Sequence, residues 1–157
     1  MEAFVDSGKV HKLGISNIYS MEKLQQLYDS VRIKPSVVQN RFRIETKFDT
    51  SIRIFCKAHN ISYQSFWTLT ANRKALRSPG IVKLAHGKGL TPQTLMFAFM
   101  MTLGHSPLSG TKNEDHMIED VAIAQRIVDG EQILTEDELN EIGGQLGLLQ
   151  VDLSSKW

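Results

Sequence analysis

The feature that most constrains the fold is a regular alternation of β-rich and helical segments along the 157 residues. Residues 9–15, 36–42, 61–66 and 105–110 are predicted strands, and capped or amphipathic segments separate them. Such alternation implies right-handed crossovers and a parallel sheet. Four units of this kind fit either a small doubly wound sheet or half of an eight-stranded barrel, because a whole barrel takes about 250 residues.

Local capping signals predict where the helices begin and end. Gly8 is expected to close a helix in residues 1–7, since glycine favours the left-handed C-terminal cap. A hydroxyl or carboxylate side chain ahead of an apolar helical pattern predicts an N-cap. The expected N-caps are Ser20, either Asp49 or Thr50, Ser78, Thr91 and Thr135, and a further helix is expected from about residue 113 to 126.

Composition excludes several classes of function. The formal net charge is +1 and the chain has no long basic run, so neither nucleic acid nor a membrane surface is an expected partner. No apolar stretch approaches the roughly 20 residues that span a bilayer. The single cysteine, Cys56, rules out an intrachain disulfide and suits a reducing compartment, so a cytoplasmic location is expected. The scattered histidines predict no metal site.

Four segments resemble motifs of the aldo-keto reductase family, in the family's order. Residues 8–17 read GKVHKLGISN, similar to the family's GKVRxxGxSN segment, and residues 34–42 read KPSVVQNRF, similar to its next strand. Residues 61–69, ISYQSFWTL, resemble the following strand and loop. Residues 107–111, PLSGT, with residues 116–120, HMIED, resemble the last strand and the helix after it. Together these motifs cover about residues 1–127.

The resemblance implies an α/β fold that is half of a (β/α)8 TIM barrel, with four parallel strands and flanking helices. Residues 1–157 would form the C-terminal, incomplete part of an aldo-keto reductase domain, and residues 128–157 a variable helical tail outside the resemblance. In this family NADPH lies across the C-terminal ends of the strands, as ligands do in other barrels of this type. The expected partners are therefore a nicotinamide dinucleotide and a small carbonyl substrate.

Carried over by position, the resemblance implies cofactor contacts along the whole chain. Ser16, Asn17 and Gln39 would hydrogen-bond the nicotinamide carboxamide, which offers two donors and one acceptor. Phe66 would stack on the nicotinamide ring. Trp67, Thr68 and Leu69 would lie in a loop beside the pyrophosphate, and the adenosine end would contact Gly110, Thr111, Lys112, His116, Glu119 and Asp120.

The adenosine end departs from the family's common pattern. The family often has lysine and serine where this chain has Gly110 and Thr111, and arginine where it has His116. Arginine grips a phosphate with two parallel hydrogen bonds and histidine cannot, although Lys112 could compensate. NADP(H) is the expected cofactor, with NAD(H) left open.

No residue of this chain aligns with the family's catalytic Asp, Tyr, Lys and His, which come from the first half of the barrel. Reduction of a carbonyl requires a proton donor at the developing oxyanion, so we expect no catalytic residue here and an inactive isolated chain. Half a barrel is also expected to expose two strand edges and an apolar interior, which a first half-barrel or a second copy could cover. Met1 falls inside a helix of the relatives, which suits a fragment or a split gene. The alternatives are a non-catalytic, nucleotide-binding accessory subunit and a degenerate fragment.

Overall fold

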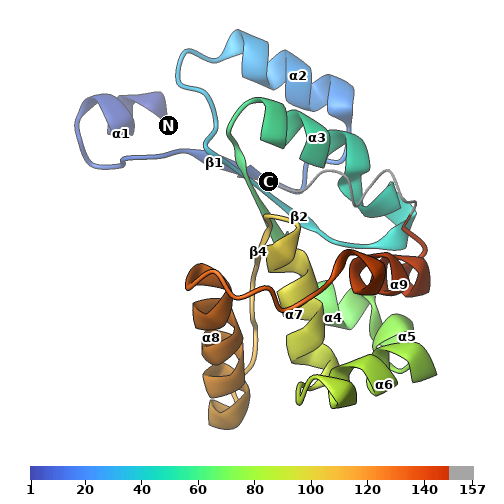
Figure 1. The fold of residues 1–157 in the computed structure, drawn as a ribbon. Coiled ribbons are helices and arrows are strands. Elements are labelled where there is room, and N and C mark those ends of the chain that lie inside the picture. The colour runs from blue at the N-terminus through green and yellow to red at the C-terminus, as the bar shows by residue number, and fades with distance from the viewer. Residues whose placement is uncertain (149–157) are drawn as a thin grey trace.

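The four predicted strands pair in parallel, in the order β1-β2-β3-β4 (Figure 1). The computed structural model describes residues 1–148. Its strands are β1 (Gly14–Ser16), β2 (Val37–Arg41), β3 (Ser62–Phe66) and β4 (Ser106–Pro107). A doubly wound sheet reverses its strand order and carries helices on both faces, whereas these strands follow one another without reversal. The half-barrel alternative is therefore confirmed.

The predicted helices are present, and four of the five expected N-caps make the expected hydrogen bond. The helices are α1 (Glu2–Asp6), α2 (Met21–Ser30), α3 (Thr50–Ala58), α6 (Pro79–Gly87), α7 (Pro92–Thr102), α8 (Glu114–Val128) and α9 (Glu136–Leu146). The side chains of Ser20, Ser78, Thr91 and Thr135 each accept a hydrogen bond from the backbone N–H three residues further along. Asp49 occupies the N-cap position of α3 without making this bond.

Three short elements were not predicted: the 3-10 helix η1 (Ile44–Asp49) and the helices α4 (Thr68–Ala71) and α5 (Arg73–Leu76). Within η1, Lys47, Phe48 and Asp49 have positive φ angles of 51°, 53° and 53°. Such angles are uncommon outside glycine and asparagine, so sequence pattern gives no sign of them.

The two edge strands are shorter than predicted. β1 begins at Gly14 and not at residue 9, and β4 covers two residues and not residues 105–110. Each edge strand pairs with a single neighbouring strand. It can therefore extend only as far as β2 or β3 has residues with which it can pair. Pro107 in β4 also has no N–H to donate to the ladder.

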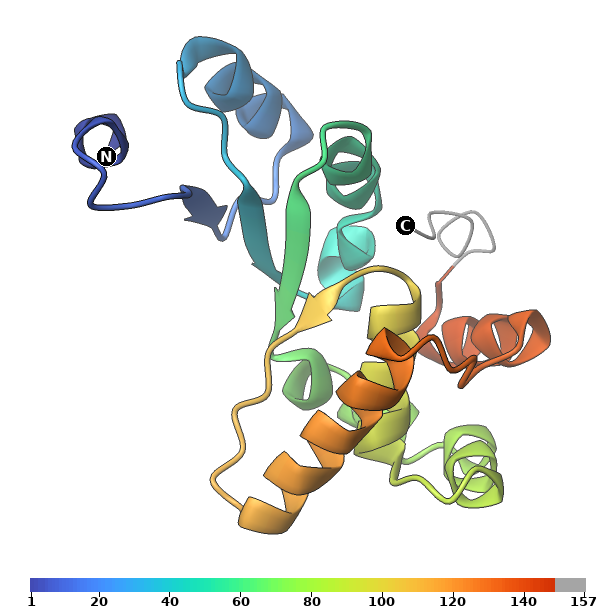
Figure 2. The same cartoon turned by 60° about the vertical axis from the view of Figure 1, so that its left-hand side comes forward.

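The sheet has one covered face and one open face, because side chains alternate along each strand. Val38 and Asn40 of β2 are buried with their partners Tyr63 and Ser65 of β3. They pack with the apolar faces of α3 and α7, which supply much of the core. Figure 2 shows the strands side by side, with α3 and α7 next to them. The core therefore lies between the sheet and its helices, as in the wall of a barrel.

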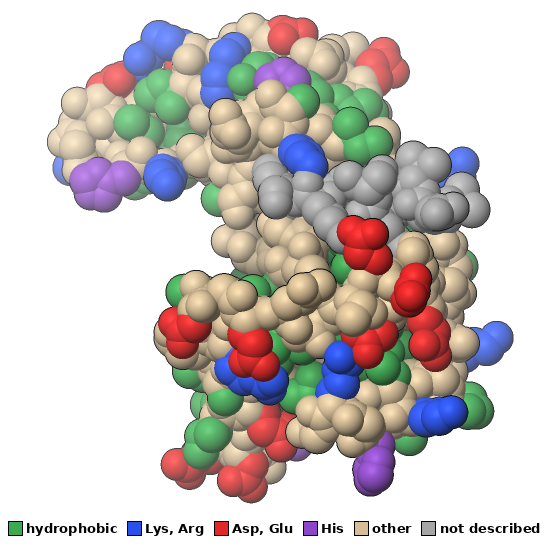
Figure 3. All heavy atoms as spheres, in the orientation of Figure 1, with side chains coloured by type: hydrophobic (Ala, Val, Ile, Leu, Met, Phe, Trp, Pro, Cys, Tyr) green, Lys and Arg blue, Asp and Glu red, His purple; other side chains and the backbone are tan. Residues whose placement is uncertain are grey.

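The open face carries the alternate residues: Ser16, Val37, Gln39, Arg41, Ser62, Gln64, Phe66 and Ser106. The expected apolar interior is thus wrong for β2 and β3, because polar side chains line most of this face and Gln39 hydrogen-bonds Gln64 across it. Figure 3 shows a hollow in the outline on this side of the molecule. The two expected open edges are present at β1 and β4.

The end of the described chain is tied to the body of the fold. α9 begins with the predicted capping box and packs against α6. The Lys88 ammonium lies 2.8 Å from the Glu138 carboxylate and donates to the Ile133 carbonyl. The last nine residues of the predicted tail, 149–157, lie outside the described residues. Within residues 1–148, none of the helices has the length and apolar character needed to cross a membrane.

Candidate functional site

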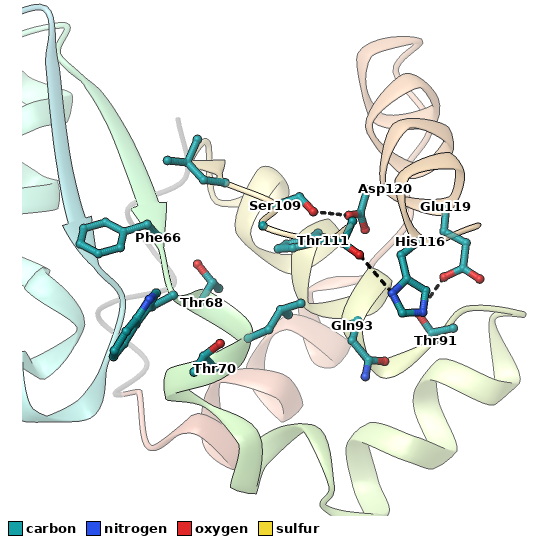
Figure 4. Close-up of a pocket in the computed structure, with 15 residues that line it drawn as sticks. Phe66, Thr68, Thr70, Thr91, Gln93, Ser109, Thr111, His116, Glu119 and Asp120 are labelled. Atoms are coloured by element: carbon teal, nitrogen blue, oxygen red, sulfur yellow. Dashed lines mark hydrogen bonds between the residues drawn. The ribbon is translucent and has the colours of Figure 1, made fainter. Parts of the chain in front are cut away.

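A cavity of about 440 Å³ opens where β3 and β4 end (Figure 4). The C-terminal ends of neighbouring parallel strands meet at one edge of a sheet, and in barrels this edge holds the functional site. One wall comes from the segment after β3, the opposite wall from the segment after β4 and from α8, and the start of α7 lies between them. The lining residues are Phe66, Trp67, Thr68, Leu69, Thr70, Thr91, Gln93, Phe97, Leu108, Ser109, Gly110, Thr111, His116, Glu119 and Asp120.

The β3 wall is shaped by an abrupt turn from strand to helix. Trp67 has a φ of 57° and 54% of its surface is exposed, so it ends the strand and projects at the cavity mouth. Thr68 is buried, and its hydroxyl donates to the Ser65 hydroxyl at 3.0 Å. Thr68 and Leu69 belong to α4, so the predicted loop at residues 67–69 is corrected to a single loop residue followed by a helix. The tight turn brings five consecutive residues, 66–70, to the cavity.

The β4 wall is held by side-chain hydrogen bonds around the start of α8. Asn113, where the helix was expected to begin, caps it by accepting from the His116 N–H. Thr111 accepts from the Asn113 N–H at 3.1 Å, and its hydroxyl oxygen lies 3.4 Å from His116 Nδ1. The Ser109 hydroxyl donates to the Asp120 carboxylate at 2.6 Å. Loop and helix thus present hydroxyls, an imidazole and a carboxylate to one space (Figure 4).

Of the residues predicted at the nicotinamide end, Ser16, Asn17 and Gln39 lie close together outside the cavity lining, and Phe66 lies within it. Ser16 pairs with Gln39 in the sheet register, and Gln39 pairs with Gln64. The Gln39 amide donates to the Gln64 carbonyl oxygen at 2.9 Å, while the Asn17 amide donates to the Ser16 hydroxyl at 3.0 Å. Phe66 lies one pleat further along β3 on the same face. The result is a continuous polar row that ends at an aromatic ring.

The structure brings together most of the predicted site residues in two groups. Ser16, Asn17 and Gln39 form the polar row, and the other predicted residues line the cavity, except Lys112. Lys112 lies in the loop between Thr111 and the N-cap of α8, outside the lining. Phe66 belongs to both groups, since it lines the cavity and faces the open side of the sheet.

Sequence reasoning missed two residues that position the loop after β1. The Tyr19 hydroxyl donates to the Asn17 side-chain oxygen at 3.1 Å. The buried Asn40 side chain accepts from the Ile18 N–H at 3.0 Å and donates to the Ile18 carbonyl at 2.6 Å. Asn17 itself has a φ of 59°, a conformation that asparagine tolerates. The sequence offers one signal for Asn40, its position directly after Gln39. Side chains alternate along a strand, so Asn40 lies on the covered face if Gln39 lies on the open one.

Arg41 was also missed, and it lies beside the cavity mouth. Its guanidinium carbon is 4.2 Å from the centre of the Trp67 ring and 5.6 Å from that of Phe66. Its Nε is buried and has no hydrogen-bond partner among the described residues. A cation stacked on an aromatic face keeps its in-plane donors available. Arg41 therefore places a positive charge at this edge of the sheet.

Behind the covered face lies a buried polar cluster of Asn40, Asp49, Tyr63 and Arg53 with His105 beside it. The Tyr63 hydroxyl donates to Asp49 at 2.9 Å, and Asn40 donates to the same carboxylate oxygen at 2.7 Å. Burial raises the pKa of Asp49, and burial followed by the Asp49 charge raises that of Tyr63 well above its usual value. Tyr63 faces the helices and not the open side, so this cluster supports the fold rather than chemistry in the cavity.

Polar side chains make up most of the cavity lining. Among the described residues that line it there is neither tyrosine nor lysine. What it offers is a set of hydroxyls, a glutamine, an imidazole and two carboxylates beside an aromatic ring. Such a set can bind and orient a polar ligand.

Comparison with known proteins identifies the class. The sequence profile of the Aldo/keto reductase family matches residues 1–141, so the chain belongs to this family. It is 28% identical over 155 residues to Protein REDOX 2 of Catharanthus roseus, and 26% identical over 156 residues to the NAD(P)H-dependent D-xylose reductase of Kluyveromyces lactis. These matches cover 95% and 92% of this chain.

Solved structures agree on the fold and on its extent. An aldo/keto reductase from Klebsiella pneumoniae, in complex with NADP and acetate, superposes with a TM-score of 0.78 at 18% identity. The match covers 96% of this chain and 53% of that one. This chain spans about half the length of its curated relatives too, since the two above are covered over 46% of their residues.

Proposed function

We propose that this chain is the cofactor-holding part of an NAD(P)-dependent aldo-keto reductase that reduces aldehydes or ketones to alcohols. The observation that carries the proposal is the cavity at the ends of β3 and β4, continuous through Phe66 with the polar row on the open face. Membership of the family, and the NADP bound to the Klebsiella pneumoniae relative, support a nicotinamide dinucleotide as the ligand.

The residues present fit such a ligand in three ways. Ser16, Asn17 and Gln39 together offer the donors and acceptors that a primary carboxamide needs, and Phe66 offers a flat face beside them. Arg41, whose guanidinium stacks on Trp67 beside the cavity mouth, carries a positive charge that suits a pyrophosphate. The wall after β4 offers hydroxyl and carboxylate groups to a ribose.

In this proposal the chain's residues bind and orient, and proton donation comes from elsewhere. A bound reduced nicotinamide supplies a hydride. The carboxamide contacts fix which face of the ring points away from the sheet, and Trp67 limits water access at the mouth. The described cavity lining contains neither tyrosine nor lysine, which supports a proton donor for the carbonyl oxygen that lies outside this set.

The test is a titration of the chain with NADH and NADPH, followed by cofactor fluorescence, and then an assay with a generic aldehyde. Saturable binding without turnover is expected from the chain alone. Turnover is expected to appear when a first half-barrel bearing a tyrosine–lysine pair is added. Absence of binding would contradict the proposal. Reduction by the chain alone would overturn the assignment of the proton donor, and binding without any rescue by the added half would identify an accessory nucleotide-binding subunit instead.

A further inference from the structure

The wall of the cavity that is formed by β4 and α8 carries negative charge. Its ionisable lining residues are His116, Glu119 and Asp120, and the described lining contains neither lysine nor arginine. Figure 4 shows Asp120 beside Ser109 and Glu119 beside His116. A ligand group that reaches this wall therefore meets two carboxylates and one imidazole.

The surroundings add to this charge. Glu114 and Asp115 occupy the first turn of α8, and Figure 3 shows acidic side chains gathered over that end of the helix. Lys112 is the one basic residue between Ser109 and Asp120, and its side chain is exposed and outside the cavity lining. One lysine is thus set against four carboxylates within twelve residues, and a charge of this kind acts over about 10 Å at 0.1 M salt.

Both lining carboxylates are held in place by hydroxyl groups. Ser109 donates to Asp120 at 2.6 Å, while the hydroxyls of Thr91 and Thr94 each lie 3.4 Å from Glu119. Among the described residues, neither carboxylate forms an ion pair. Each carboxylate can accept about four hydrogen bonds, so both keep acceptor capacity for a ligand.

The carboxylates of this wall favour binding of a ribose diol and disfavour binding of a phosphate. In dinucleotide-binding proteins a carboxylate accepts from the ribose 2′-hydroxyl of NAD, while a nearby arginine accommodates the 2′-phosphate of NADP. A phosphate monoester carries close to two negative charges at neutral pH. Juxtaposed like charges suppress binding of the wrong partner, so a 2′-phosphate at this wall is disfavoured.

We infer that the cavity selects NAD(H) over NADP(H), with Asp120 and Glu119 as the specificity-determining residues. The inference rests on the proposed function, because it takes the cavity to hold a nicotinamide dinucleotide with its adenosine ribose at the α8 wall. His116 adds to the preference for NAD(H), because a histidine cannot form the two parallel hydrogen bonds that an arginine forms with a phosphate. The expected preference is about tenfold or more in dissociation constant.

The experiment compares the dissociation constants of the full chain for NADH and NADPH by fluorescence titration at low salt. It is repeated for Asp120→Asn and Glu119→Gln, which remove charge with little change of shape. Asp129→Asn is the matched control, because it removes one carboxylate from the other end of α8. Competition by 5′-AMP and by adenosine 2′,5′-bisphosphate isolates the adenosine end.

The wild-type chain is expected to bind NADH about tenfold more tightly than NADPH. Asp120→Asn is expected to tighten NADPH and weaken NADH, so that the ratio falls several-fold, while Asp129→Asn leaves the ratio unchanged. 5′-AMP should compete better than the bisphosphate. Equal or tighter binding of NADPH by the wild-type chain would overturn the selection and leave the proposed function standing. If neither cofactor bound, the proposed function would fall together with the selection.

Discussion

The two faces of the sheet differ in what their side chains do, although they are made from the same strands. On β3, Tyr63 is fully buried against the helices and hydrogen-bonds Asp49, while its neighbour Gln64 lies on the open face and hydrogen-bonds Gln39. Side chains alternate between the two faces of a strand. Residues on the covered face therefore stabilise the fold, while their direct neighbours on the open face can contact a ligand. Substitutions at adjacent positions should separate these two roles.

The largest effect is expected from truncation on the covered face. Tyr63→Ala should cost about 3–5 kcal/mol of unfolding free energy, because it removes a buried ring and leaves Asp49 short of a donor. Gln64→Ala, one residue away, should change stability by less than about 1 kcal/mol. Urea denaturation measures both. Tyr63→Phe is the graded control if the alanine variant does not fold, and equal losses at the two positions would contradict the division between the faces.

A pH effect of intermediate size is expected from His105, which lies behind the covered face near Phe42 and Tyr63. Burial, followed by the charge of Arg53, lowers the pKa of His105 well below its usual value. The unfolded chain takes up a proton near pH 6.5 and the folded chain does not, so His105 should reduce stability as the pH falls below that value. The slope approaches about 1.4 kcal/mol per pH unit.

His105→Leu should remove this slope, while the other titrating groups remain in both proteins. The measurement is the difference in unfolding free energy between wild type and His105→Leu at pH 7, 6 and 5. The difference should change in favour of the variant as the pH falls. A constant difference across this range would show that His105 titrates normally in the folded chain.

The smallest of these effects is expected on the open face. Gln39→Ala should weaken binding of the reduced cofactor about three- to tenfold, because one or two neutral hydrogen bonds are lost. Its effect on stability should stay below about 1 kcal/mol. Ser62→Ala is the matched control, since Ser62 shares this face at the opposite end of β3. Loss of stability without loss of binding would place Gln39 among the structural residues.

The alternating strands and long helices could be predicted from sequence because their signals are local, whereas the choice of a half-barrel came from the family resemblance. Hydroxyl N-caps at Ser20, Thr91 and Thr135 act through the next turn of chain, so pattern alone locates them. The short elements could not be predicted. The left-handed run at Lys47–Asp49 and the turn at Trp67 have no glycine, and they are held by contacts distant in sequence, such as the bond from Asn40 to Asp49.

Only part of the site could be predicted, because sequence motifs are local and do not show contacts between distant segments. The family motifs point to Gln39 and to the stretch around His116, but they do not show which neighbours complete the site. Thr91 and Gln93 enter the cavity because α7 packs beneath it, and Arg41 lies over Trp67 because β2 and β3 pair in that register. These placements follow from tertiary packing, which no local pattern encodes.

Amide hydrogen exchange of the full chain, with and without saturating NADH, tests the central claim most directly. The account predicts slower exchange in residues 66–71 and 109–120, where the two cavity walls lie, with α9 unchanged as an internal reference. Protection confined to other segments, or no change at any NADH concentration, would contradict the claim that this cavity holds the cofactor.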